Sequence, residues 1–329
     1  MENKKTIKNL EISKRSKKSF FVKISLWARL RRMIARTFIA VLSFLSRIYV
    51  PYIFLGVVNR VLPLFESIFI CYAGDQRYAK HYTFEWLETV IKWTPTPIGF
   101  FKQGNHWGIV FASPMTERDF LSDKNEHQFK KIINRLHFIA KLLNVKKVRY
   151  AGILPKIVEK RFSIDSSSTN KTTARAVFAA YKRIIRENSN MAQAPVIILG
   201  GSGFLGRQVC GLLEKDSVKT HVVDLVDGSP RIPPELYGQT SVLLDVSRKN
   251  VIDRYLEDFW PEMLVINETF PEPSKKTVSK LKLRGIRVLH LSGVHGKVFP
   301  PLPHAYSSSV PCCAIHDDHS EIIPIIKEL

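Results

Sequence analysis

The sequence is poor in cysteine and in acidic residues. Its 329 residues include four cysteines whose positions match neither a zinc-ligand spacing nor a disulfide framework: Cys71, Cys210, Cys312 and Cys313. A small fold held by disulfides is therefore excluded, and we expect a reducing compartment. The His-Asp-Asp-His run at residues 316–319 offers adjacent side chains, which seldom face one ion, so we expect solvated surface and no metal there.

The shortage of acidic residues leaves a net charge of +21, because 50 Lys and Arg stand against 29 Asp and Glu. Residues 1–36 contain twelve basic residues, and only Glu2 and Glu11 are acidic. Such a run indicates an anionic partner, either a lipid surface or a nucleic acid, with a solvated tail as the alternative. Nucleic acid is the less favoured partner, since no aromatic residues are interleaved with the lysines and no nucleic-acid-binding motif is present.

From residue 20 onward the chain becomes apolar while arginines continue along one side of a helix: Arg29, Arg32, Arg36 and Arg47. This pattern is typical of a cationic amphipathic helix at a membrane surface. Residues 37–58 are nearly long enough to span, but Arg47 and Pro51 disfavour a span. We therefore expect an interfacial or re-entrant pair of helices, 20–50 and 51–66, on the cytoplasmic face of a membrane. The alternative is that these helices pack on the folded domains.

Composition and hydrophobic pattern divide the chain into three segments. Residues 1–66 form the basic, apolar helical segment, residues 67–190 an α/β substrate domain, and residues 191–329 a Rossmann-type dinucleotide-binding domain. In the middle segment we predict strands at 67–73, 108–112 and 148–154, helices at 128–143 and 172–188, and a loop at 163–171. This order favours an α/β layer.

The last segment alternates buried-strand runs with helical patterns. We predict strands at 196–199, 221–225, 241–245, 263–267 and 287–291, and helices at 204–214, 249–259 and 274–284. Strands and helices at this spacing predict a doubly wound parallel sheet. The fold class is therefore α/β, with a C-terminal Rossmann-type sheet after a smaller α/β domain.

A glycine-rich turn follows the first strand of this sheet and opens its first helix. Gly201, Gly203 and Gly206 give the G-x-G-x-x-G spacing in the context that dinucleotide binding requires. The pyrophosphate is then expected at the helix N-terminus, contacted along the turn by Gly200, Gly201, Ser202, Gly203, Phe204, Leu205 and Gly206. The alternative is a glycine turn without a ligand.

Two polar residues at strand ends complete the expected cofactor site. Asp224 ends the second strand, where its carboxylate can accept hydrogen bonds from a ribose and repel a 2′-phosphate, so NAD(H) is favoured over NADP(H). Asn267 ends the strand at 263–267, where it contacts the nicotinamide ribose or substrate, or only caps the next turn. The turn and both strand ends together predict an NAD(H) site at the carboxyl edge of the sheet.

Three stretches resemble two-domain enzymes in which a substrate domain precedes the Rossmann domain. Residues 200–213 are similar to the glycine turn of the long-chain acyl-(acyl carrier protein) reductases, and residues 169–174 to the threonine- and asparagine-rich turn found there. Residues 267–271 resemble the Asn-x-Thr-Pro turn of shikimate dehydrogenases. The resemblance implies a helix N-terminus pointing into the cleft near Thr172, and a cysteine nucleophile if the enzyme is an acyl reductase, with Cys71, Cys312 and Cys313 as candidates. The Tyr-x-x-x-Lys pair of short-chain dehydrogenases is absent after the turn.

No single residue identifies itself as the acid or base of hydride transfer. His295 and Lys297 lie in a Gly- and Pro-rich loop after the last strand, and Lys156 follows the strand at 148–154, so these are the candidates. We therefore expect an NAD(P)-dependent oxidoreductase acting on a carbonyl or acyl substrate, which the N-terminal helices suggest is lipid-derived. The alternative is a non-catalytic NAD(P)-binding protein docked on a membrane or a partner.

Overall fold

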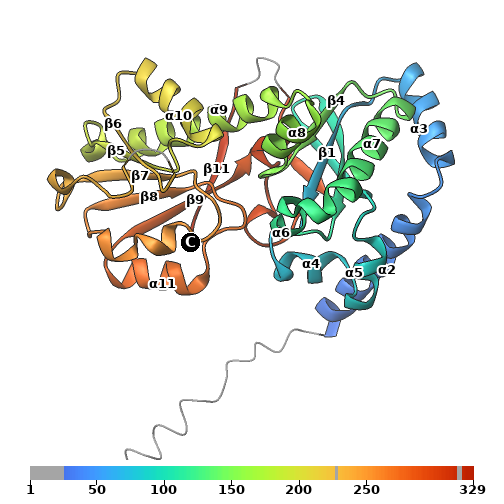
Figure 1. Cartoon of the computed structure of the whole chain (residues 1–329), viewed down its shortest axis with the longest axis horizontal. Helices are drawn as coiled ribbons and strands as arrows, with labels where there is room; N and C mark the ends of the chain where they lie inside the picture. Colours follow the sequence, from blue (N-terminus) through green and yellow to red (C-terminus); the bar gives the residue numbers. More distant parts are fainter. Residues whose placement is uncertain (1–25, 227–228, 317–320) are drawn as a thin grey trace, which may run out of the picture.

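A computed structural model describes residues 26–226, 229–316 and 321–329. Two sheets lie side by side, each with helices packed against it (Figure 1). The expected fold class, an α/β protein with a C-terminal Rossmann-type sheet, is confirmed by their topology.

The second sheet is the Rossmann-type sheet. Its strand order is β11-β9-β8-β7-β5-β6, and all neighbouring strands are parallel except β11 with β9. The strands are β5 (Val196–Leu199), β6 (Thr220–Val223), β7 (Ser241–Asp245), β8 (Met263–Asn267), β9 (Arg287–Val294) and β11 (Pro324–Glu328), and the helices are α10 (Phe204–Lys215) and α11 (Lys275–Leu283). Because the chain turns from β5 to β6 on one side and returns to β7 on the other, the switch point of the sheet lies between β5 and β7.

The first sheet has the order β10-β2-β3-β1-β4. Its strands are β1 (Phe65–Tyr72), β2 (Thr96–Gln103), β3 (His106–Ser113), β4 (Lys147–Tyr150) and β10 (Lys297–Phe299). Its helices are α4 (Gln76–Tyr82), α5 (Glu85–Ile91), α6 (Glu117–Leu121), α7 (Glu126–Leu142) and α8 (Leu154–Phe162). Strand β10 comes from the C-terminal segment, so residues 191–329 contribute to both sheets.

Two predicted elements are wrong in whole or in part. The loop predicted at 163–171 is right for residues 163–166 only, because helix α9 (Ser167–Glu187) already begins at Ser167, whose backbone N–H donates to the Asp165 carboxylate at 2.9 Å. The helix predicted at 249–259 is replaced by two short 3-10 turns, Ile252–Arg254 and Leu256–Asp258. Residues of this segment line a cavity between the sheets, and the chain reaches β8 through the two short turns.

The helices α2 (Leu26–Leu45) and α3 (Val50–Val61) pack on the first sheet and on α7. Their inward faces combine small and polar side chains with the buried apolar residues Ile39 and Tyr52. Ser43 and Ser46 of this region are buried, and Asn59 donates to the carbonyl of Leu143 at 3.0 Å. Arg47 donates to the carbonyl of Val90 at 2.9 Å, so it faces the protein. Arg36 likewise donates to the carbonyl of Lys80, whereas Arg29 and Arg32 are exposed, so only part of the arginine side contacts the first sheet's helices.

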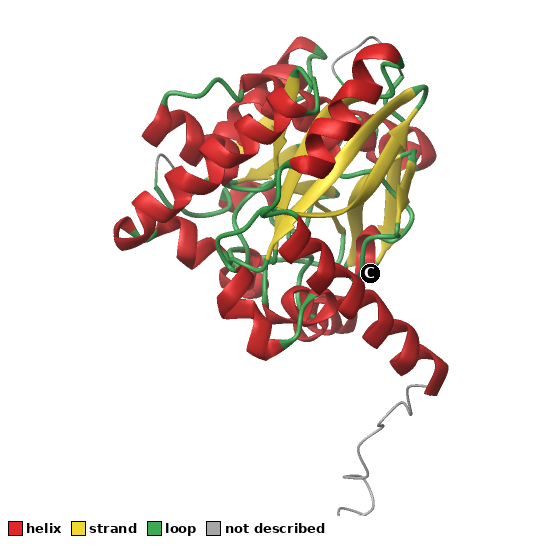
Figure 2. Cartoon of the chain, turned by 90° about the vertical axis from the view of Figure 1, so that its right-hand side faces the viewer, coloured by secondary structure: helices red, strands yellow, loops and turns green. Residues whose placement is uncertain are grey.

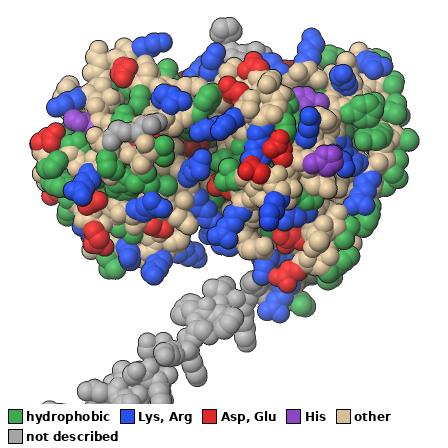
Figure 3. Space-filling model, viewed as in Figure 1, with side chains coloured by type: hydrophobic (Ala, Val, Ile, Leu, Met, Phe, Trp, Pro, Cys, Tyr) green, Lys and Arg blue, Asp and Glu red, His purple; other side chains and the backbone are tan. Residues whose placement is uncertain are grey.

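The opposite sides of α2 and α3 expose large apolar side chains. Leu26 is 82% exposed and Trp27 80%, and the exposure continues along both helices through Met33, Ile34, Phe38, Val41, Phe44, Ile53, Phe54 and Val57. In Figure 2, α2 continues from the grey trace along the outside of the molecule, and Figure 3 shows apolar side chains gathered along this edge. Among the described residues no single helix is long and apolar enough to cross a membrane; the pair Arg32–Leu45 and Val50–Val61 reaches that length and composition together, bent by 88°.

Candidate functional site

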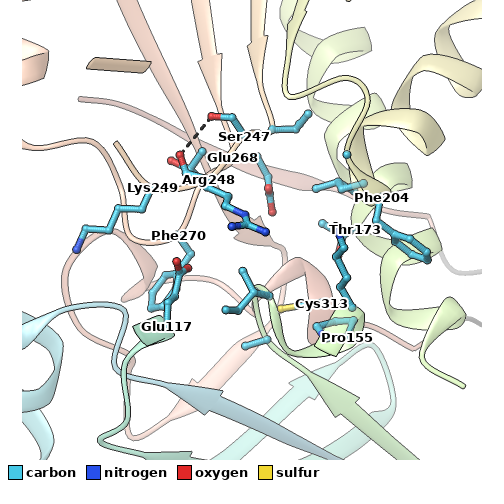
Figure 4. Close-up of a pocket in the computed structure, with 18 of the residues that line it drawn as sticks. Glu117, Pro155, Thr173, Phe204, Ser247, Arg248, Lys249, Glu268, Phe270 and Cys313 are labelled. Carbon is cyan, nitrogen blue, oxygen red and sulfur yellow. Dashed lines mark hydrogen bonds between the residues drawn. The ribbon is translucent and has the colours of Figure 1, made fainter. Parts of the chain in front are cut away.

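A cavity of about 1030 Å³ lies between the two sheets, at the carboxyl ends of β1, β5, β7 and β8. Its other walls come from α8, from the first turns of α9 and from the segment around residues 302–313. Figure 4 shows side chains from both halves of the molecule directed into it. Ligands bind at this edge of open α/β sheets, so the cavity is the candidate active site.

The glycine turn forms one wall of the cavity, as expected from the sequence. Gly200 has a φ of +86°, which favours glycine, and a Cβ at Gly206 would lie 2.2 Å from the Gly200 carbonyl oxygen. A Cβ at Gly203 would meet only that oxygen, at 3.0 Å, and would otherwise occupy cavity space. The turn is therefore packed closely on its inner side and open on the side where a pyrophosphate would lie, which fits a dinucleotide.

Asp224 stands beside this turn at the end of β6. Its carboxylate accepts the backbone N–H of Ser202 at 3.2 Å and that of Val226 at 3.0 Å. These two bonds fix the carboxylate at the rim of the cavity, where a ribose bound on the turn would reach it. Arg207 and Arg254 line the same part of the cavity.

Two basic residues in the segment after β7, Arg248 and Lys249, line the cavity and were missed by the sequence analysis. The Arg248 side chain points into the open space, whereas Lys249 points away toward the first sheet (Figure 4), where its Nζ lies 3.4 Å from the Asp75 carboxylate. The signal was available, because a basic pair in the segment after the strand at the switch point of the sheet is placed to meet an anionic or carbonyl oxygen.

Asn267 lies behind the cavity wall, and its amide is fully used there. Its Nδ2 donates to the Asp245 carboxylate at 2.8 Å and to the Thr269 hydroxyl at 2.9 Å. Its Oδ1 is 2.8 Å from Nδ1 of His290, and since burial lowers the pKa of that histidine to about 4, the neutral ring donates this bond. The structure thus places Asn267 in a buried hydrogen-bond network and outside the cavity lining, to which its neighbours Glu268 and Thr269 belong.

Glu268 is the carboxyl group best placed for proton transfer. It is partly buried, with its exposed part toward the cavity, and burial raises its pKa to about 8. The Cys312 thiol donates a weak hydrogen bond to it at 3.5 Å. In Figure 4 the Glu268 carboxyl and the Arg248 guanidinium point toward the same space. An acid that is neutral at pH 7 and becomes charged near pH 8 is suited to general acid–base work.

The cysteines of the cavity are poor nucleophiles. Burial raises the pKa of Cys71 and of Cys313 to about 12, and that of Cys312 well above its ordinary value. A thiol attacks as its thiolate, so these groups are held in the unreactive form. The thioester route that the resemblance implied for an acyl reductase is therefore disfavoured.

The structure places the three proton-transfer candidates from the sequence in different parts of the molecule, one in the cavity and two outside it. Lys156, in the first turn of α8, lines the cavity. His295 and Lys297 are exposed and do not line it, because β10 carries this segment to the outer edge of the first sheet, where Lys297 pairs with Lys102 of β2. Of the loop expected over the cofactor after the last parallel strand, residues 297–299 pair as a strand instead, and the later part, with Leu302, Pro303 and Tyr306, lines the cavity.

Helix α9 reaches the cavity with side chains of its first two turns. Thr169, Asn170 and Thr173 line the cavity, and Thr173 lies beside Phe204 at the start of α10 (Figure 4). The expected helix start near Thr172 is wrong, since the helix already begins at Ser167. The backbone N–H groups of residues 172–174 therefore lie inside the helix and do not form its free N-terminus. Helix α9 instead presents the side chains of Thr169, Asn170 and Thr173 to a ligand in the cavity.

Comparisons with known proteins identify no family. No family model matches the chain, and no curated protein matches it. Among solved structures it is similar to L-tryptophan dehydrogenase from Nostoc punctiforme, with 11% identity over 68% of this chain and 69% of that one and a TM-score of 0.32. A likeness of this size carries no argument on function, which is therefore argued from the site.

Proposed function

We propose that this protein is an NAD(P)-dependent oxidoreductase that reduces or oxidises a carbonyl substrate in the cavity between its two sheets. The observation that carries the proposal is the opening of the glycine turn and of the Glu268 carboxyl into one cavity. A bound nicotinamide cofactor supplies or accepts the hydride there. The alternative, a non-catalytic NAD(P)-binding protein, also explains the glycine turn. It gives no role to a protonated carboxyl group in the same cavity.

The residues of the cavity divide the work of such a reaction. Residues 200–206 hold the pyrophosphate, and Asp224 accepts hydrogen bonds from the adenosine ribose, which favours NAD(H). Arg248 binds the substrate oxygen and stabilises the negative charge that develops on it. Glu268 gives its proton to that oxygen during reduction and takes it back during oxidation.

The cofactor site is tested by calorimetric titration of NADH and NADPH into the full chain. We expect NADH to bind more tightly than NADPH, and Asp224→Ser to remove this preference. Gly203→Ala should weaken the binding of both cofactors by about tenfold or more, because its Cβ occupies the side of the turn where the pyrophosphate would lie. Gly211→Ala is the matched control, since its Cβ has no neighbour within 4 Å. Equal binding by Gly203→Ala and the wild-type chain would refute the site. Cofactor binding without turnover of any aldehyde or ketone would favour the non-catalytic alternative.

We further propose that the enzyme works at an anionic membrane surface, with a lipid-derived carbonyl compound as substrate. The support is the row of large apolar side chains that α2 and α3 turn outward, whereas their inward faces bury Ile39 and Tyr52 among small and polar groups such as Asn59. Basic side chains adjoin the apolar face, among them the exposed Arg29, Arg32 and Arg60. An apolar surface beside cationic groups suits the headgroup and acyl boundary of a bilayer that contains anionic lipid.

Flotation of the full chain with lipid vesicles tests this role. We expect binding to vesicles of phosphatidylcholine with phosphatidylglycerol, weaker binding to phosphatidylcholine alone, and a loss of about tenfold or more for the double variant Phe38→Ser and Phe54→Ser. Leu283→Ser on α11 is the control, because that leucine is 88% exposed on the other half of the molecule. Retention of binding by the double variant, or equal loss in the control, would contradict the proposal.

A further inference from the structure

Three side chains that are distant in the sequence meet at the end of the first sheet opposite the cavity. Glu66 lies at the start of β1 and His106 at the start of β3, and these neighbouring strands are parallel, so their first residues are adjacent. His316 follows the 3-10 turn Cys312–Ala314 and reaches the same point from the C-terminal segment. One ligand atom from each of the three lies within 4.8 Å of the others.

The distances are close to those of a metal site. Nδ1 of His106 is 2.6 Å from Oε1 of Glu66, and Nδ1 of His316 is 3.8 Å from Oε2 of the same carboxylate. In a tetrahedral zinc site with bonds of about 2.0–2.2 Å, two ligand atoms lie about 3.3–3.6 Å apart. The His106 and Glu66 atoms therefore have to separate, and the more distant ligand atoms, which all lie within 4.8 Å of one another, have to come closer. Side-chain rotation of the partly exposed Glu66 and His106 provides this adjustment.

His316 supplies the independent observation that points to a ligand. Its side chain is 1% exposed, and among the described residues its Nδ1 has no hydrogen-bond partner. Its Nε2 lies 3.4 Å from the Ser67 hydroxyl, and its backbone N–H donates to Oε1 of Gln103 at 3.1 Å. With the proton on Nε2 and donated to Ser67, the lone pair of Nδ1 faces Glu66, which is how a second-shell hydrogen bond orients a metal-binding histidine.

Positive charges near the cluster make the Glu66 carboxylate essential for binding a cation. Lys147 and Arg149 of β4 are near enough to act on His316 electrostatically and oppose a second cation. Glu66 is the group in the cluster that offsets them.

We propose that Glu66, His106 and His316 bind a divalent transition metal ion, with Zn²⁺ as the ion that this His₂Glu donor set suits and water in the remaining position. The ion ties the C-terminal segment to the first sheet. The same segment carries Cys312 and Cys313 into the cavity, so the metal stabilises the cavity wall without touching it. The expectation of solvated surface is wrong at His316, which is buried; residues 317–319 lie outside the described ones.

The test is calorimetric titration of ZnCl₂ into the untagged full chain after treatment with a chelator. We expect one equivalent to bind, and Co²⁺ to give the visible absorption bands of a low-coordinate nitrogen and oxygen site. Glu66→Gln and His106→Gln change partly exposed residues, so the chain should still fold, and each should lower zinc affinity by about tenfold or more. Ser67→Ala should lower it by about tenfold through the orientation of His316.

His127→Gln on the exposed side of α7 is the control and should bind zinc as the wild-type chain does. Absence of a one-equivalent site in the wild-type chain would overturn the proposal. So would zinc affinity in Glu66→Gln and His106→Gln equal to that of the control. These readouts do not depend on NADH binding or turnover, so the metal site and the proposed oxidoreductase activity succeed or fail separately.

Discussion

At the scale of single residues, the end of β8 separates two neighbouring side chains into different roles. Successive side chains of a strand point to opposite sides, so Asn267 turns into the buried network with Asp245 and His290 while Glu268 reaches the cavity. The network fixes the end of the strand, and the strand fixes Glu268. A carboxyl group held this way keeps its proton at neutral pH because the cavity wall solvates its charge poorly.

Replacement of Glu268 by glutamine should remove activity and change the pH dependence of stability. The folded pKa of about 8 is above that of the unfolded chain, so the protonated carboxyl favours the native state at low pH, and this contribution is lost as the pH rises toward 8. Glu268→Gln lacks this loss, so from pH 6 to pH 8 its free energy of unfolding should rise by about 2 kcal/mol relative to the wild-type chain. Urea unfolding at both pH values measures the difference.

The same variant should lower kcat by about a hundredfold or more while the dissociation constant of NADH stays unchanged. Wild-type reduction should slow above about pH 8 as Glu268 loses its proton. Glu262→Gln, which changes an exposed carboxylate just before the same strand, is the control for both measurements. An unchanged pH–rate profile in Glu268→Gln would assign proton transfer to another group, of which Lys156 is the one already placed in the cavity.

At the scale of elements, helix α3 shows how closely the N-terminal pair is fitted to the first sheet. Gly56 faces the C-terminal end of α7, where an added Cβ would lie 1.7 Å from the carbonyl oxygen of Leu142. One turn further on, Asn59 accepts the backbone N–H of Phe65 at 2.7 Å and so joins α3 to the start of β1. Together with the buried ring of Tyr52, these backbone and small or polar groups make the contact, and other bulky side chains of the helix, such as Phe54 and Val57, stay outside.

Gly56→Ala should therefore destabilise the protein, by about 1–3 kcal/mol, because α3 has to move away from α7. Gly211→Ala should have the opposite sign, a gain of about 0.5–1 kcal/mol, since its helix position is free of neighbours and alanine is the better helix former. Thermal and urea unfolding of the two variants compare them directly. Destabilisation by the same amount in both would mean that the close approach at Gly56 does not decide the packing of α3.

The elements that the sequence predicts well are those whose pattern is local. The runs at 196–199, 241–245 and 263–267 are continuous and apolar because these strands are buried on both faces, and their observed bounds match the predicted ones. Strand β2 was missed because Pro97 and Lys102 interrupt its pattern on a partly exposed strand. Strand β10 was missed because it has three residues and forms only by pairing with β2, far away in the sequence.

The same distinction between local and distant contacts decides which parts of the candidate site could be predicted from the sequence. The glycine turn and Asp224 follow from a motif within one unit of the chain, and the structure places both at the cavity. Glu268 and Arg248 carry no motif, and their suitability comes from burial and from the meeting of two sheets. His316 with Glu66 is the extreme case, because only the pairing of β1 with β3 and the path of the C-terminal segment bring them together.

At the scale of the whole molecule, the two sheets share one hydrophobic core. The largest cluster of buried side chains runs without a break from Ile68 of β1 through Ala176 of α9 to Val196 and Leu289 of the second sheet. Helix α9 packs against α10 and β11 as well as against α8. Strand β10 closes the connection by returning from the second sheet to the first. The segments before and after residue 190 therefore share this core, and the later one also adds a strand to the first sheet.

A shared core predicts that the described parts of both sheets unfold together, even though the cofactor is expected to contact mainly the second. NADH at about one hundred times its dissociation constant should stabilise the native state by about 2.7 kcal/mol. Because the sheets are coupled, calorimetry should show one transition that moves as a whole. Independent domains would give two transitions, of which only that of the second sheet would move with NADH, and the cavity would then lie at a hinge. A single moving transition would mean instead that cofactor binding on the glycine turn also stabilises the part of the cavity wall that Thr169 and Lys156 line.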